Sequence, residues 1–280
     1  MQGRKNLKSI LTTPFIHVFL ILLGLLQIFP IITLFFNSFR TDTAIKKMPI
    51  GLPTSFSLQN YIETWTRGEY AVAFRNSILV GAVTIVIVLI CGGLAGYSIV
   101  KLELPFKGFF TGYFMMAMAL PGFLYIVSDY YIFHRLNLVN SLVGIIIIYA
   151  AGTIPFNLLL IRTFLIGIPK ELEEAARVDG CNEIKVFLNI TVPLAKPILT
   201  TVALLVFIST WNEFLFANTF LTDDNIRTVA TRFVKFTSEW TRDLAKIFTA
   251  GAITLMPIII LYLFLQQKFI EGMTKGGLKG

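Results

Sequence analysis

The sequence predicts an all-α membrane protein with six transmembrane helices. Of its 280 residues, 55% are apolar and only 14% are charged, and the mean hydropathy is +0.75. These values argue against an ordinary soluble domain. Apolar runs long enough to cross a bilayer, which takes about 20 residues, recur along the chain. They place the spans at residues 11–38, 73–100, 108–130, 139–163, 197–222 and 246–268.

The segments between these runs are too short or too polar to hold a separate soluble core, so residues 1–280 are expected to form one domain. The net charge of +8 comes from basic residues that are scattered between the spans. Such scattering indicates anchoring near the membrane and argues against a nucleic-acid partner.

The start of the chain resembles a signal peptide, because Arg4, Lys5 and Lys8 precede an apolar run. The run is too long and lacks a small-residue cleavage site, so we expect an uncleaved first span with a cytoplasmic amino terminus. Arg135 is the only Lys or Arg in the short loop after the third span. This distribution favours both termini on the cytoplasmic side.

Several residues within the spans indicate how the helices pack. Gly92 and Gly96 lie four apart in the second span and predict close packing of two helix backbones. Pro121 in the third span predicts a kink or a local opening. Tyr125 then belongs either to an aromatic belt at the membrane interface or to a surface that contacts substrate. Asn157 in the fourth span either joins helices or binds substrate.

The segment 168–196 is a long polar stretch that is patterned like two short helices. Pro169 suits the first helical position, and Glu171, Glu173 and Glu174 follow where carboxylates favour the positive end of a helix. Gly180 permits the left-handed turn that ends a helix. Asn182 can cap a second helix running toward Ile190, which Pro193 and Pro197 are expected to stop. The pattern alone fits an ordinary amphipathic loop equally well.

A family resemblance distinguishes these interpretations. The segment resembles the EAA loop of permease subunits in ABC importers, in which EAA, three residues, Gly, nine residues and then Ile-x-Leu-Pro follow one another. Val192 stands at the Leu position, which is one conservative departure. The resemblance implies a type I ABC importer permease fold, whose cytoplasmic coupling helices contact an ATPase subunit. The residues expected to form that contact are Glu174, Ala175, Ala176, Asp179, Gly180, Ile190 and Pro193.

Roles within that contact follow from the same resemblance. Glu174 is expected to pair with a basic residue of the ATPase, and Ala175 and Ala176 to permit close docking. Gly180 is expected to set the turn between the two short helices.

Three further stretches resemble the carbohydrate, maltose-type branch of that family. They are Leu58–Tyr61 before the second span, Trp211–Phe214 in the fifth span, and the tail Gln267–Gly280. This likeness implies an importer of a sugar or oligosaccharide. Within Trp211–Phe214, an ionisable residue in a span suggests function. Asn212 and Glu213 therefore either line the translocation path or, in the case of Glu213, lie near the outer surface.

The chain contains no G-x-x-x-x-G-K-[ST] motif, so it is not expected to hydrolyse ATP itself. By resemblance it binds no cofactor, and ATP and Mg²⁺ are bound by two partner ATPase subunits. A second permease subunit and an extracytoplasmic sugar-binding protein complete the expected assembly in the bacterial cytoplasmic membrane. The alternatives are an importer of peptides or amino acids, a secondary transporter, or a membrane enzyme, for which no reactive constellation is evident.

Overall fold

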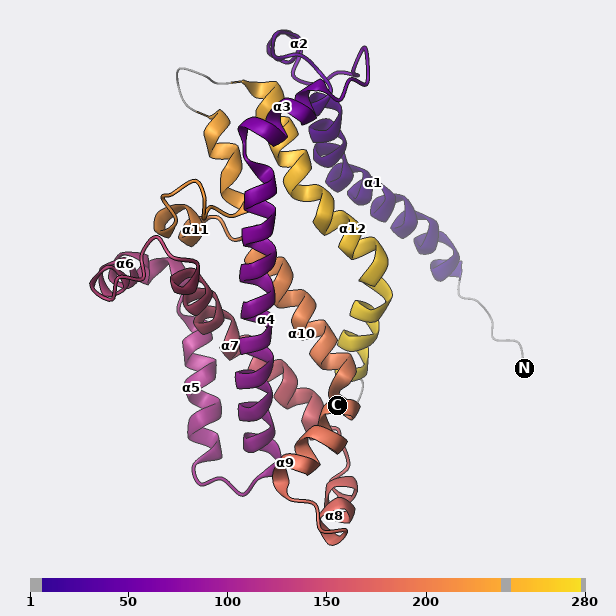
Figure 1. Ribbon diagram of the computed structural model, residues 1–280. Coiled ribbons are helices and arrows are strands. Elements are labelled where there is room, and N and C mark those ends of the chain that lie inside the picture. The colour runs from indigo at the N-terminus through magenta and orange to yellow at the C-terminus, as the bar shows by residue number, and fades with distance from the viewer. Residues whose placement is uncertain (1–6, 238–242, 278–280) are drawn as a thin grey trace. The chain divides into compact units, whose positions relative to one another are not determined.

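The computed structural model describes residues 7–237 and 243–277, which contain helices and no strand. Five helical segments in those ranges are long and apolar enough to cross a membrane, and a sixth is formed by two pieces bent by 81° (Figure 1). The chain divides into two compact units, residues 1–68 with 233–256, and residues 69–232 with 257–280. The expected single permease domain stays a prediction.

The first unit contains α1 (Leu7–Ser38), α2 (Asp42–Lys47), α3 (Gln59–Arg67) and the first part of α12 (Leu244–Gly277). Its organising side chain is Asn60, whose amide donates to the carbonyl oxygens of Ser38 at 2.9 Å and Arg40 at 3.0 Å. Carbonyls at a helix end lack partners within the helix. The Leu58–Tyr61 stretch therefore closes the end of α1, aided by a 2.7 Å hydrogen bond between the hydroxyls of Ser38 and Tyr61.

The second unit contains the remaining long helices and the segment 168–196, the predicted coupling segment. Its elements are α4 (Tyr70–Lys101), α5 (Lys107–Ala119), η1 (Gly122–Tyr125), α6 (Ile126–Arg135), α7 (Leu142–Ile166), α8 (Glu171–Val178), α9 (Glu183–Val186), the π-helical turn η2 (Phe187–Thr191), α10 (Val192–Asn212) and α11 (Leu215–Phe220). It also contains the part of α12 from Pro257 onward, and the unit boundary divides η3 (Val229–Phe236).

Helices α4, α7 and α10 form the core of this unit, with Val88, Ile161 and Val202 buried between them. Gly92 and Gly96 are buried, and a Cβ added at Gly92 would lie 3.7 Å from the Leu158 backbone of α7. The predicted glycine-mediated packing of helix backbones is therefore confirmed, and the partner helix is α7.

The third span is broken where the sequence predicted an interruption. Helix α5 ends at Ala119, and the chain resumes as η1 and α6 after Pro121. The Tyr125 hydroxyl donates to the Leu120 carbonyl at 2.9 Å, which gives a partner to a carbonyl beside the break. Released backbone groups at membrane depth need such partners. The span expected at 108–130 is thus two helices meeting at 81° rather than one kinked helix.

The expectation that Pro193 and Pro197 stop the second coupling helix is wrong. The chain continues from α9 through η2 into α10, with Pro193 in the first turn of α10 and Pro197 inside it. Proline is tolerated in a first turn, where its missing N–H costs little. The fifth helix also ends earlier than residue 222, because the backbone leaves the helix at Glu213 before α11 begins.

Candidate coupling site and translocation cavity

The turn between α8 and α9 has the geometry predicted from the sequence. Gly180 has a φ of +82°, and its N–H donates to the Arg177 carbonyl at 3.0 Å. The N–H of Cys181 donates to the Ala176 carbonyl at 3.0 Å, which completes a Schellman motif. The Asn182 side chain then accepts from the Lys185 N–H at 2.9 Å and caps α9. Two local signals thus fix the angle between the short helices.

The predicted coupling residues differ in exposure. Most of the set is exposed, and Ile190 is half-buried; the exposed members are Glu174, Ala175, Asp179, Gly180 and Pro193. Ala176 is only 8% exposed and packs within its own chain. Of the two alanines expected to permit close docking, only Ala175 therefore offers a surface to another subunit. Val178, which the sequence analysis did not single out, is 88% exposed beside them.

A buried ion pair that the sequence analysis missed ties this segment to α4. Glu173 is 1% exposed, and its carboxylate lies 3.3 Å from the Lys101 ammonium. The same carboxylate accepts from the Thr191 hydroxyl at 3.1 Å, and Lys101 also donates to the Ile168 carbonyl at 2.8 Å. The end of α4 thus binds the beginning of the coupling segment directly and, through Glu173, its end.

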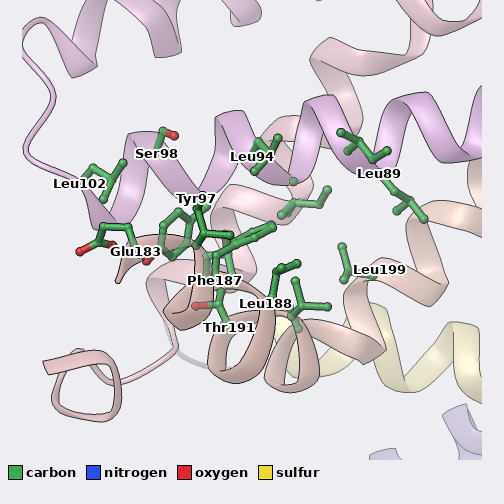
Figure 2. Close-up of a pocket in the computed structure, with 17 residues that line it drawn as sticks. Leu89, Leu94, Tyr97, Ser98, Leu102, Glu183, Phe187, Leu188, Thr191 and Leu199 are labelled. Carbon is green, nitrogen blue, oxygen red and sulfur yellow. Dashed lines mark hydrogen bonds between the residues drawn. The ribbon is translucent and has the colours of Figure 1, made fainter. Parts of the chain in front are cut away.

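A series of polar contacts connects the Lys101–Glu173 pair to α9. Arg177 lies 4.0 Å from Glu173 and donates to the Glu183 carboxylate at 2.6 Å. This hydrogen bond raises the pKa of the Arg177 guanidinium above its ordinary value. The Tyr97 hydroxyl of α4 donates to the other Glu183 oxygen at 3.0 Å (Figure 2). Helices α8, α9 and α4 are therefore joined by one hydrogen-bonded network.

Next to this network lies an apolar pocket of about 640 Å³. Figure 2 shows Tyr97 and Leu94 of α4 on one side and Phe187 and Leu188 of the π-helical turn on the other. The rings of Tyr97 and Phe187 meet edge to face with centroids 5.1 Å apart. Apolar packing between α4 and the turn is incomplete here, so the polar contacts form a large part of the connection.

A second cavity, of about 660 Å³, is lined by the broken third span, α7 and α10. Tyr125 and Glu213 line it, together with Asp129, whose side chain the sequence analysis did not assign to the path. Asn157 and Asn212 are absent from the described residues that line it. Asn157 is buried and donates to the Thr153 carbonyl at 2.8 Å, and Asn212 is exposed. The structure therefore brings together two of the four predicted path residues.

Glu213 has a defined geometry in this cavity. Its carboxylate accepts the N–H groups of Phe216 at 2.9 Å and Ala217 at 3.0 Å, and the Tyr149 hydroxyl at 2.6 Å. The carboxylate thus caps α11 while lining the cavity. Pro155 in the same wall has no N–H, so the Ala151 carbonyl one turn earlier lacks its helical donor. Both features place hydrogen-bond acceptors in the wall.

Among the described residues, no group of three or more His, Cys, Asp or Glu side chains could hold a metal ion. Residues 238–242 and the side chains of the Gln267–Gly280 tail lie outside the part that the structure describes.

Comparisons with known proteins identify the family of the chain and its fold. A family model described as the binding-protein-dependent transport system inner membrane component matches residues 89–275. YurM of Bacillus subtilis, a probable ABC transporter permease protein, is 35% identical over 95% of this chain and 88% of its own length. MelC of Bacillus subtilis, a melibiose/raffinose/stachyose import permease protein, is 30% identical over 81% of this chain and 83% of its own.

Two further matches extend the comparison. AraQ of Halalkalibacterium halodurans, an arabinooligosaccharides transport system permease protein, is 29% identical over 92% of this chain and 93% of its own. A crystal structure of a bacterial ABC transporter involved in the import of the acidic polysaccharide alginate superimposes with a TM-score of 0.80. At 23% identity it covers 96% of this chain and all of the matched chain, and it shows that the fold is shared.

Proposed function

The chain belongs to the family of binding-protein-dependent transport system inner membrane components, and we propose that it imports a neutral sugar or oligosaccharide by alternating access. It is a multi-pass protein of the inner membrane. In this proposal both termini are cytoplasmic, and the 168–196 segment faces the cytoplasm. The chain pairs with a second permease subunit and receives its substrate from an extracytoplasmic binding protein.

The cavity beside the broken third span supports the substrate class. Tyr125, Tyr149 and Phe156 supply aromatic rings, on which the C–H faces of a sugar ring pack. Carboxylates of Asp129 and Glu213 are acceptors for sugar hydroxyls. Two carboxylates also disfavour an anionic substrate through like-charge repulsion. The printed names of related permeases, which include arabinooligosaccharides and melibiose/raffinose/stachyose, agree with a carbohydrate.

The exposed surface of α8 is the proposed contact with the ATPase subunit. Glu174 pairs with a basic residue there, Ala175 permits close approach, and Asp179, Ile190 and Pro193 complete the contact. ATP and Mg²⁺ are bound by the two ATPase subunits, and this chain contributes no catalytic residue. Closure of the ATPase subunits moves the segment and so changes the side to which the cavity opens. The shift between the inward-open and outward-open states is driven by contacts with the ATPase subunits that differ between these two states.

The single observation that carries the coupling assignment is the Schellman turn at Gly180, which joins two short helices in the EAA spacing. The test is ATP hydrolysis by the copurified complex in liposomes, with and without the binding protein and a panel of neutral sugars, uronic acid oligomers, amino acids and dipeptides. Stimulation by one neutral sugar class is expected. Stimulation by amino acids or dipeptides alone would favour the second candidate, a non-sugar importer, and absence of any associated ATPase would refute the coupling assignment.

A further inference from the structure

Helix α4 differs from the other long helices in that it contains no proline. Among the described helical segments able to cross a membrane unbroken, α1, α7, α10 and α12 each contain at least one, whereas α4 has none. Proline removes a helical hydrogen bond and kinks the helix around it. Helix α4 is therefore the span best suited to move as one rigid body.

One end of α4 is fastened to the coupling segment by buried polar contacts. Lys101, in the last turn, pairs with Glu173 at 3.3 Å, and both side chains are almost fully buried. Tyr97, one turn earlier, donates to Glu183 at 3.0 Å. Removal of one partner of a buried ion pair strongly destabilises a protein, because the other charge is left buried without compensation. The coupling segment is therefore held to α4, although α7 and α10 are its neighbours in sequence.

The opposite end of α4 is fastened in the same manner to the segment 224–232. The buried Asn76 amide donates to the carbonyls of Asn225 at 2.9 Å and Arg227 at 3.1 Å. The buried Ser77 hydroxyl accepts the Val229 N–H at 2.9 Å. These contacts satisfy backbone groups of the 224–232 segment, so that segment depends on α4 for its conformation.

Arg232, whose side chain is fully buried, makes a second connection at the Tyr70 end of α4. Its guanidinium lies 3.3 Å from Glu69, the residue directly before α4, and 3.3 Å from Asp224. Figure 1 shows α4 running uninterrupted between this end and the end beside α8 and α9. Ser77 and Lys101 are about 36 Å apart along the helix, at about 1.5 Å per residue.

We propose that α4 is the element that carries movement between the coupling segment and the 224–232 segment. The inference rests on the proposed function, which takes the coupling segment as the ATPase contact and places it on the cytoplasmic side. The 224–232 segment is bonded to the opposite end of α4, farther along the helix than the thickness of a bilayer core, which is about 30 Å. It therefore lies on the outer side in this proposal, and we assign it to the surface on which the binding protein docks. Glu173 and Lys101 at one end, and Asn76 and Ser77 at the other, are then positioning residues. Coupling between two sites is reciprocal in binding free energy. If one conformation of the ATPase subunits strengthens docking of the binding protein, then docking stabilises that same conformation of the ATPase subunits.

The test uses the whole complex in liposomes and measures the ratio of ATP hydrolysis with the sugar-loaded binding protein to hydrolysis without it. Glu173→Gln removes the charge at the coupling end with little change in shape, and Asn76→Leu removes the two donors at the far end. Glu103→Gln is the matched control, because Glu103 is an exposed carboxylate just beyond α4. We expect each of the first two variants to reduce the ratio about tenfold, within the range of allosteric couplings, and the control to leave it unchanged.

The double variant distinguishes one shared path from two separate defects. If α4 is the path, Glu173→Gln with Asn76→Leu reduces the ratio no further than either change alone. Should Glu173→Gln prevent assembly by leaving the Lys101 charge unpaired, Lys101→Met with Glu173→Gln removes both charges and is measured instead. A normal ratio in the assembled single variants, or losses that multiply in the double variant, would overturn the inference. Failure of the proposed function would be seen separately, because the sugar-loaded binding protein would then not stimulate ATP hydrolysis by the wild-type complex.

Discussion

Substitution of Gly180 tests the turn on which the coupling assignment depends. Gly180 has a φ of +82°, and no atom lies within 4 Å of the position that a Cβ would occupy. A side chain there meets no steric clash, so its cost is the backbone strain alone. The left-handed conformation costs L-residues other than glycine about 1–2 kcal/mol. That cost lowers the ratio of the docking-competent turn to other conformations by a factor of about 5–30.

The substitution series separates backbone strain from side-chain size. Gly180→Val is expected to weaken copurification of the ATPase and ATP-dependent uptake by up to about 5–30-fold, because the apparent affinity falls with the fraction of chains in the competent conformation. Gly180→Asn is expected to retain most of both, since Asn tolerates the left-handed region. The assay is ATPase retained per permease in the purified complex, followed by uptake in liposomes.

Two results would refute this reasoning. Wild-type coupling in Gly180→Val would mean that the turn is not needed for docking. Equal losses in Gly180→Asn and Gly180→Val would mean that the side chain itself, and not the backbone conformation, obstructs the contact.

Three further predictions concern the buried contacts. Lys101→Met is expected to destabilise the chain by up to about 3–5 kcal/mol, because it removes the nearer cation from the buried Glu173 carboxylate and leaves Arg177 at 4.0 Å as its ion-pair partner. Lys101→Met with Glu173→Gln is expected to recover most of that loss, and thermal unfolding in detergent measures both variants. Gly96→Ala is expected to be tolerated, because an added Cβ lies 3.4 Å from Ile161, which is ordinary contact. Gly96→Leu is expected to cost about 1–3 kcal/mol by overpacking. Equal stability of the two variants in the same unfolding assay would contradict this prediction. Glu213→Gln is expected to reduce sugar uptake about tenfold through the loss of a charged acceptor with ATPase copurification intact, and unchanged uptake would remove Glu213 from the path.

Local signals in the sequence were sufficient for the shape of the coupling segment. Gly180 ends α8 and Asn182 caps α9 as predicted, because each acts on backbone groups within a few residues of itself. Which of two adjacent glutamates is buried could not be predicted in the same way. Glu173 and Glu174 differ by the side of α8 on which they lie, and that side is defined by Lys101 on a distant helix.

The same limit applies to the helix ends. The break at Pro121 was predicted because proline acts locally, whereas the bend of 81° depends on surrounding packing. The end of α10 at Glu213 was missed because the apolar pattern continues through residue 221. A signal was present, since an acidic side chain just before a short apolar helix can accept its first N–H groups, as Glu213 does for α11.

Cross-linking of the coupling segment to the ATPase subunit tests the central claim most directly. In a chain with Cys91 and Cys181 replaced by Ser, a cysteine at the exposed position of Val178 is treated with a short bifunctional reagent in the assembled complex. The matched control is a cysteine at Leu136, which is also exposed and lies between α6 and α7. The account predicts a Val178→Cys cross-link to the ATPase whose yield changes with ATP, and none from Leu136→Cys. A cross-link from Leu136→Cys alone would place the ATPase at the opposite end of α7 from the coupling segment and contradict the account.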